Sequence, residues 1–213
     1  MTSVITIARQ ALVRRGLQLN YLTIGYNTLE AIVSMVAGFI AGSVSLVGFG
    51  VDSVIEVTAS AAAQCRLRAD LDPARRAHVE GVTRRVIGAS FLALSAYVTI
   101  ESIVTLVRRE APEPSLIGLA VLVLSAIVMP LLARAKHRVA HALGSHALEA
   151  EATQTSACAY LSIIALTGVA ANTFGGWWWA DPLAALGMVP ILVKEGLEGL
   201  RDESCCDHQD GPG

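Results

Sequence analysis

Six long apolar stretches constrain what this chain can fold into. Crossing a bilayer as a helix takes about 20 mostly apolar residues. The stretches that qualify cover residues 17–41, 43–64, 84–107, 115–133, 144–171 and 177–200. Only 16% of all residues are charged, whereas soluble domains typically carry about 25%. The sequence therefore predicts an all-α fold, a polytopic membrane bundle of six transmembrane helices.

Basic residues are distributed unevenly between the connectors of this predicted bundle. Connectors 38–43 and 172–176 are short and uncharged, whereas 66–85 and 134–146 are basic. With the N-terminus inside, 14 of the 16 Lys and Arg residues fall on inner segments, and only Arg108 and Arg109 lie outside. The positive-inside rule then predicts that both the N- and the C-terminus are cytoplasmic.

The predicted bundle takes up most of the chain. We expect a cytoplasmic N-terminal segment at 1–16, a transmembrane domain at 17–201 and a short cytoplasmic tail at 202–213. Residues 1–20 lack the compact apolar core and small-residue cleavage site of a secretory signal. We therefore expect a multi-pass protein of the cell inner (plasma) membrane. No feature indicates a nucleic-acid partner, and no nucleophile–base pair indicates an enzyme.

Four acidic residues lie inside the apolar stretches, namely Glu30, Asp52, Glu56 and Glu101. A charge at the bilayer centre costs about 2.5–3.5 kcal/mol on insertion scales, so it usually faces a bundle interior or a water-filled cavity. Asp52 and Glu56 are four residues apart and share one helix face. Two such carboxylates repel each other, and either a proton or a cation relieves the repulsion. The pair is therefore a candidate site for exchanging one against the other.

The fifth stretch carries a polar stripe of Glu151, Gln154, Thr155 and Cys158, at i, i+3, i+4 and i+7 spacing. Carboxylate and amide oxygens with a thiolate suit zinc or another borderline divalent metal. At 1.5 Å per residue, Glu30, the paired acids and Cys158 lie about 14–21 Å from the outer helix ends, and Gln154 lies deeper. These groups are expected to meet near the membrane midplane, where transporter sites usually lie.

These residues also have purely structural explanations. The paired acids suit a polar network between helices, and Gln154 and Thr155 suit hydrogen bonding from one helix to another. Cys158 alone is more often a small buried hydrophobic residue than a ligand. Asn27 and Glu30, three residues apart, are candidates for an additional cation or proton site, together with Glu151 and Thr155. Glu101 lies near the outer end of its helix, where it can reach water.

Several further features have expected structural roles. Residues 177–179 are three tryptophans, as in the aromatic belt at a membrane surface. Asp181 followed by Pro182 predicts a helix start, with Asp181 as its N-cap. Small residues are expected to permit close helix packing at Gly38, Gly42, Gly48 and Gly50.

Two clusters on the predicted cytoplasmic side contain metal-binding residue types. His137, His141 and His146 lie in a basic stretch, where they either capture metal or belong to an orienting connector. The tail sequence Cys205-Cys206-Asp207-His208 suits a soft metal, and acylation of its cysteines is an alternative.

Around the paired acids the chain resembles the cation diffusion facilitator family. The resemblance covers residues 17–201 and is carried by three segments: Gly42-Ser43-Val44-Ser45-Leu46, Val51-Asp52-Ser53-Val54-Ile55-Glu56 and Ala180-Asp181-Pro182-Leu183-Ala184-Ala185-Leu186. It implies a homodimer that exports a divalent metal, commonly zinc, in exchange for protons. The metal is then a transported substrate, and no permanently bound cofactor is expected.

The resemblance also implies roles for individual residues. It makes Asp52 and Glu56 metal ligands. The family's other half-site is a His and an Asp one turn apart on the fifth helix. Aligning the helices places Gln154 and Cys158 there, or Thr153 and Ala157 after a shift of one residue, so the usual pair is replaced. The cytoplasmic metal-binding domain that typically follows the sixth helix is also absent from residues 202–213.

Together these patterns favour a divalent metal cation transporter that works by alternating access and proton antiport. The replaced half-site leaves two alternatives. One is a non-transporting member that senses metal or serves a partner protein. The other is a carrier of a different cation or of a small cationic compound.

Overall fold

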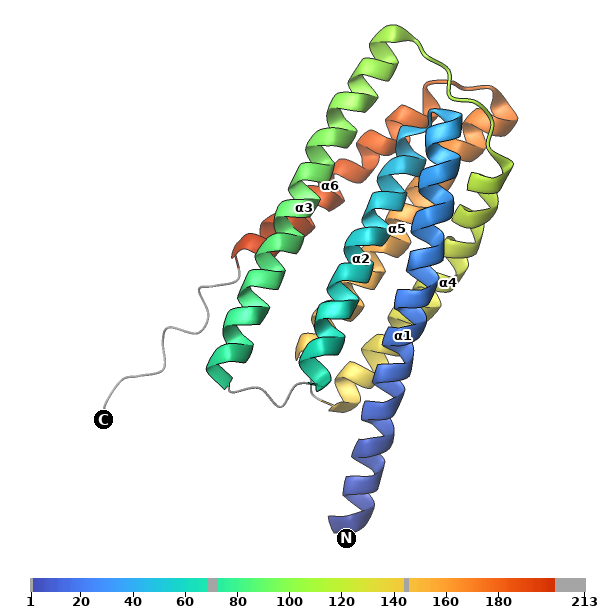
Figure 1. Cartoon of the computed structure of the whole chain (residues 1–213). Helices are drawn as coiled ribbons and strands as arrows, with labels where there is room; N and C mark the ends of the chain where they lie inside the picture. Colours follow the sequence, from blue (N-terminus) through green and yellow to red (C-terminus); the bar gives the residue numbers. More distant parts are fainter. Residues whose placement is uncertain (1, 69–72, 144–145, 202–213) are drawn as a thin grey trace.

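Six helices run alternately in opposite directions through the part of the chain that the computed structural model describes (Figure 1). The structure describes residues 2–68, 73–143 and 146–201, and these contain no strand. The predicted all-α bundle is therefore confirmed. The helices are α1 (Thr2–Ala41), α2 (Val44–Arg68), α3 (Pro73–Arg108), α4 (Leu116–Leu143), α5 (His146–Gly175) and α6 (Ala180–Arg201).

Several helices are longer than the apolar stretches that predicted them. α1 begins at Thr2 rather than at residue 17, α3 begins at Pro73 rather than at 84, and α4 ends at Leu143 rather than at 133. The extensions are rich in Ala, Arg and other strong helix formers. An apolar stretch indicates the part of a helix that can lie in the membrane, whereas the helix itself continues through any residues with high helix propensity.

Five of the helices contain a stretch long and apolar enough to cross a membrane, at residues 12–41, 44–61, 85–108, 116–143 and 151–175. These establish a multi-pass membrane protein. α6 does not meet the same criterion, because charged residues such as Lys194, Glu195 and Glu198 interrupt its second half. It nevertheless packs along α3 and α5 within the bundle. That α6 crosses the membrane stays a prediction.

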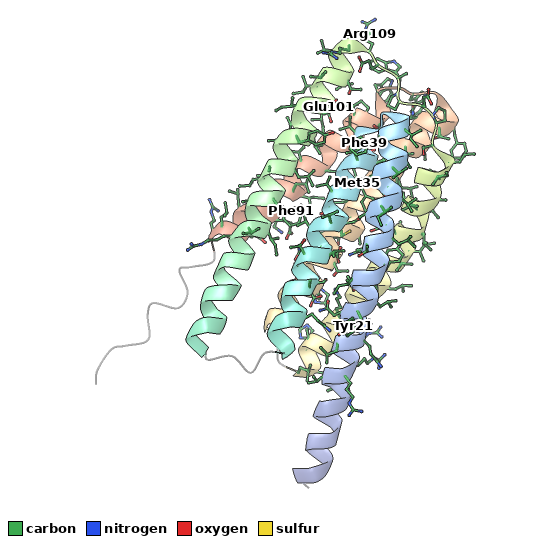
Figure 2. The ribbon with its side chains drawn as sticks, viewed as in Figure 1. Tyr21, Met35, Phe39, Phe91, Glu101 and Arg109 are labelled. Carbon is green, nitrogen blue, oxygen red and sulfur yellow. The ribbon has the colours of Figure 1, made fainter. Side chains whose placement is uncertain are left out.

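The two ends of the bundle differ in composition. At one end α1, α3 and α5 begin and α2 and α4 finish (Figure 1). We call it the basic end, because it carries the exposed side chains of Arg14, Arg15, Arg134 and Arg138. At the opposite end, the tryptophan end, Trp177 and Trp179 are exposed and stack with ring centroids 5.6 Å apart. Arg109 lies at this end (Figure 2).

Three of the four glycines singled out from the sequence lie at close helix contacts, as predicted. A Cβ at Gly38 would lie 2.8 Å from Val47 Cγ2, and one at Gly50 would lie 2.7 Å from Met35 Cγ. At Gly48 it would lie 3.1 Å from Val98 Cγ2. For Gly42 the prediction was wrong. It borders open space, and its φ of +65° forms the tight turn between α1 and α2.

Asp181 caps a helix other than its own. The backbone of α6 starts from Trp179, whose carbonyl oxygen accepts a hydrogen bond from Leu183 N at 3.1 Å. The carboxylate of Asp181 instead accepts hydrogen bonds from Val44 N at 2.9 Å, Ser43 Oγ at 2.7 Å and Ser45 Oγ. The prediction that Asp181 caps α6 was therefore wrong. Asp181 caps α2 and so connects the start of α6 to the start of α2.

Candidate cation site

The buried acids of α1 and α2 lie together. Glu30, Asp52 and Glu56 are each at most 3% exposed. Ser53 Oγ donates a hydrogen bond to Glu30 Oε2 at 2.9 Å, which joins the two helices. All three carboxyls lie close enough to interact electrostatically with one another. The one-turn spacing of Asp52 and Glu56 thus places both acids on the face of α2 that points into the bundle.

Most carboxyl oxygens of these acids lack a hydrogen-bond partner. Both Oε atoms of Glu56, Oδ2 of Asp52 and Oε1 of Glu30 are buried and accept no hydrogen bond. Buried polar groups are normally paired, and an unpaired buried carboxylate is costly. These oxygens are therefore available to a proton or to a cation.

A thiol from α5 completes this group. Cys158 is 2% exposed, and its sulfur lies beside the carboxyls of Asp52 and Glu56. We call Glu30, Asp52, Glu56 and Cys158 the acid cluster. Oxygen and sulfur ligands of this kind suit a borderline divalent metal. The structure thus brings together four of the residues predicted from the sequence, from three different helices.

Two residues near the acid cluster were missed in the sequence. The hydroxyls of Tyr26 on α1 and Ser125 on α4 are buried and lie beside Glu30. Tyr26 is one turn from Glu30 on the same helix face. Ser125 is the one polar side chain between residues 116 and 129. The spacing of Tyr26 from Glu30 and the isolated polar Ser125 could each have indicated these positions. Because Ser125 lies on α4, it adds a fourth helix to the site.

The other predicted ligands differ in their surroundings. Asn27 is fully buried one turn before Glu30, and neither of its amide atoms has a partner. Gln154 is half-buried, with an unpartnered Nε2. In the alternative register, Thr153 is exposed and donates to the Glu149 carbonyl at 3.0 Å. The geometry therefore favours the register with Cys158 over the one with Thr153.

Glu151 and Thr155 are bound to a lysine that sequence reasoning placed in a connector. Lys136 Nζ lies 2.9 Å from Glu151 Oε1 and 3.0 Å from Thr155 Oγ1. Lys136 lies within α4 and is only 3% exposed, so its placement in a connector at 134–146 was wrong. The signal was its spacing: with Ser125, Met129 and Leu132 it continues the buried face of α4. The polar stripe of α5 is therefore divided, with Cys158 at the acids and the other two residues at Lys136.

The predicted histidine cluster contacts α5 instead of gathering around one point. His137 Nε2 lies 3.5 Å from Ser156 Oγ, and exposed His141 lies 3.8 Å from Glu149. The side chain of His146 and the tail residues Cys205, Cys206 and His208 lie outside what the structure describes. Among the side chains it does describe, no three of His, Cys, Asp or Glu are arranged to hold a metal ion. Metal ligation by the acid cluster stays a prediction.

The chain matches a family model for the cation efflux transmembrane domain over residues 21–204. The chain belongs to the cation efflux (cation diffusion facilitator) family. This family consists of membrane transporters and not of enzymes, in agreement with the expectation from the sequence.

Relatives of the chain are about a quarter identical to it over the aligned residues. Magnetosome protein MamB of Paramagnetospirillum magneticum is 26% identical over 182 residues, which covers 79% of this chain and 61% of the relative. MamB of Magnetospirillum gryphiswaldense gives the same values. An uncharacterized transporter of Methanocaldococcus jannaschii, MJ0449, is 25% identical over 183 residues, covering 83% of this chain and 64% of the relative. The chain thus spans less than two thirds of the length of these relatives.

Proposed function

We propose that the chain transports a divalent metal cation across the membrane and binds it at Asp52 and Glu56. The observation that carries this proposal is the set of buried, unpartnered carboxyl oxygens on α2, at the centre of a cation efflux domain. Glu30 and Cys158 lie beside them. Gln154 supplies an amide oxygen, and Asn27 and Glu30 form an additional cation or proton site.

The chemistry of the ligands indicates which cations bind. A site of carboxylates alone would suit hard ions such as Mg²⁺ or Mn²⁺, whereas a thiolate favours zinc and softer ions. The sulfur of Cys158 beside the paired acids therefore supports zinc or a similar borderline ion as the substrate. The substitution of Gln154 and Cys158 for the expected His and Asp changes which ion the site prefers.

Charge balance supports proton antiport. With Glu30 and Cys158 protonated, ionised Asp52 and Glu56 are neutral together with one divalent cation, and so are the same two carboxyls when each holds a proton. Because a net charge in the bilayer interior is costly, the bundle moves most easily in one of these two neutral states. The cation then binds from the cytoplasm as protons leave, and protons displace it on the outer side. We further propose a homodimer, as the family resemblance implies, in the inner membrane. The distribution of basic residues supports cytoplasmic termini.

Flux into proteoliposomes tests this function. Purified protein is given a panel of divalent cations, with a pH-sensitive dye inside the vesicles and Asp52→Ala as the control. We expect flux of a subset of ions, with protons moving the opposite way, and loss of both signals in the control. Absence of flux for every ion, with folded protein, would contradict transport.

A second candidate function is metal sensing without transport. The replaced fifth-helix pair favours it, because the site lacks the family's usual His and Asp. Metal that protects the protein against thermal unfolding, in the same preparation that shows no flux, would identify this role.

A further inference from the structure

Six buried polar residues form a second layer beside the acid cluster. Ser60 Oγ donates to Glu151 Oε1 at 3.1 Å, the same oxygen that Lys136 contacts. Asn20 Nδ2 donates to the Ser60 carbonyl at 2.9 Å and to Gln64 Oε1 at 3.0 Å. We call the set the inner polar layer. It comprises Asn20, Ser60, Gln64, Lys136, Glu151 and Thr155.

The inner polar layer lies between the acid cluster and the basic end. On α2, Ser60 is four residues past Glu56, about 6 Å closer to that end. On α5, Thr155 and Glu151 lie about 4.5 and 10.5 Å from Cys158 in the same direction. The layer spans α1, α2, α4 and α5, the same helices that surround the acids. On the side of α2 that faces α1, α4 and α5, the layer therefore lies between the basic end and the acid cluster.

The ion pair stabilises a closed layer. Lys136 and Glu151 are both buried and neutralise each other, so opening the layer between them separates two opposite charges in a medium of low dielectric. The ammonium of Lys136 is held by a carboxylate and a hydroxyl, so moving it away costs a charged hydrogen bond. Removing either partner of a buried pair leaves an uncompensated charge. The layer is thus stable only with both charges in place.

We propose that the Lys136–Glu151 ion pair closes the path from the basic end to Asp52 and Glu56, and that it separates when these acids become accessible from that end. The role of this closure in cation transport rests on the proposed function. The closure itself is measurable without any metal, because Cys158 is a native thiol at the acid cluster.

Reaction of Cys158 with thiol reagents tests the closure. The protein keeps Cys158 as its single cysteine, with Cys65, Cys205 and Cys206 changed to Ser, and is reconstituted into vesicles. Two small membrane-impermeant methanethiosulfonates, one cationic and one anionic, are applied separately to each face. We expect Lys136→Met to raise the labelling rate of both reagents about tenfold from the basic-end face and to leave it unchanged from the other face. A tenfold change corresponds to a loss of about 1.4 kcal/mol in the free energy that favours the closed layer.

Further variants separate closure from charge and from misfolding. Lys194→Met, on the exposed side of α6, should leave all rates unchanged. Glu151→Gln should raise the same rates as Lys136→Met, and exchanging the two charges (Lys136→Glu with Glu151→Lys) should restore slow labelling. A faster cationic but slower anionic reagent would show only a local charge effect and overturn the proposal. So would unchanged rates, or faster labelling from both faces.

The labelling rates of Cys158 and the cation flux can succeed or fail independently of each other. If labelling responds as expected while no cation is transported, the closure is supported and the proposed transport function fails. If cations are transported while labelling does not respond, the opposite holds.

Discussion

At the scale of single residues, the buried carboxyls of this protein differ in how many hydrogen-bond and ion-pair partners each has. Asp181 accepts three hydrogen bonds at a helix start, and Glu151 is paired with an ammonium and a hydroxyl. Glu30 has one serine donor on one oxygen. Glu56 is equally buried, yet neither of its oxygens has a partner. Structural roles account for the first two acids, and Glu56 is the one that most requires a proton or a cation.

Cys158 is expected to influence ion preference. Replacing its sulfur by oxygen in Cys158→Ser removes the soft ligand beside Asp52 and Glu56 while keeping a similar volume. We expect the ratio of cadmium to manganese flux to fall roughly tenfold, which corresponds to about 1.4 kcal/mol. The ratio of initial rates in proteoliposomes measures this. Ser156→Ala, on a neighbouring residue that contacts His137, should leave the ratio unchanged, and an unaltered ratio in Cys158→Ser would exclude sulfur from the site.

At the scale of helices, contacts between ends and faces fix how the bundle packs. Asp181 binds the first turn of α2, so the negative carboxylate compensates the free N–H groups and the positive end of that helix. Close contacts at Gly38 and Gly50 then hold α1 against α2. The positions of Asp52 and Glu56 on α2 relative to Glu30 on α1 depend on the Asp181 contact and on these glycine contacts.

Loss of the Asp181 carboxylate should destabilise the protein. In Asp181→Ala the N-terminus of α2 loses three hydrogen bonds to a charged group, and we expect the free energy of unfolding to fall by about 2–3 kcal/mol. Thermal unfolding in detergent micelles measures the change. Glu110→Ala, an exposed residue near the same end, serves as the control. Equal stability of the two variants would refute the capping role.

The glycines of α1 offer a matched pair of tests. A methyl group at Gly38 would meet Val47 at 2.8 Å, whereas one at Gly25 meets nothing within 4 Å. Gly38→Ala should therefore separate α1 from α2 and destabilise the bundle by about 1–3 kcal/mol. Gly25→Ala should be neutral or stabilising by up to about 1 kcal/mol, because alanine favours the helix. Similar melting temperatures for both would contradict the packing of α1 on α2.

The sequence could predict the helices but not all of their partners. Apolar windows identified six helices in order, and a four-residue spacing identified Asp52 and Glu56, because both depend on neighbours along the chain. Asp181 and Lys136 were misplaced because their partners are distant in sequence, at Val44 and on α5. A charged residue at a helix end looks the same in sequence whether it faces water or a buried partner. Only tertiary packing decides between them.

At the scale of the whole molecule, two groups of buried polar side chains are shared by the same four helices. The acid cluster and the inner polar layer both lie among α1, α2, α4 and α5, while α3 and α6 pack against each other beside them. Glu101 lies on α3 (Figure 2), outside this core. α3 and α6 also pack against α2 and α5, so all six helices contact the part of the bundle that holds the acids.

The proposed transport requires that Asp52 and Glu56 carry the cation. The initial rate of zinc influx into proteoliposomes, recorded together with the internal pH, tests this requirement. The experiment compares the unaltered protein with Asp52→Asn, Glu56→Gln and, as a matched acid on α3, Glu101→Gln. We expect zinc influx coupled to proton efflux, lost in the first two variants and retained in the third. Zinc influx that persists at the unaltered rate in Asp52→Asn and Glu56→Gln would contradict it.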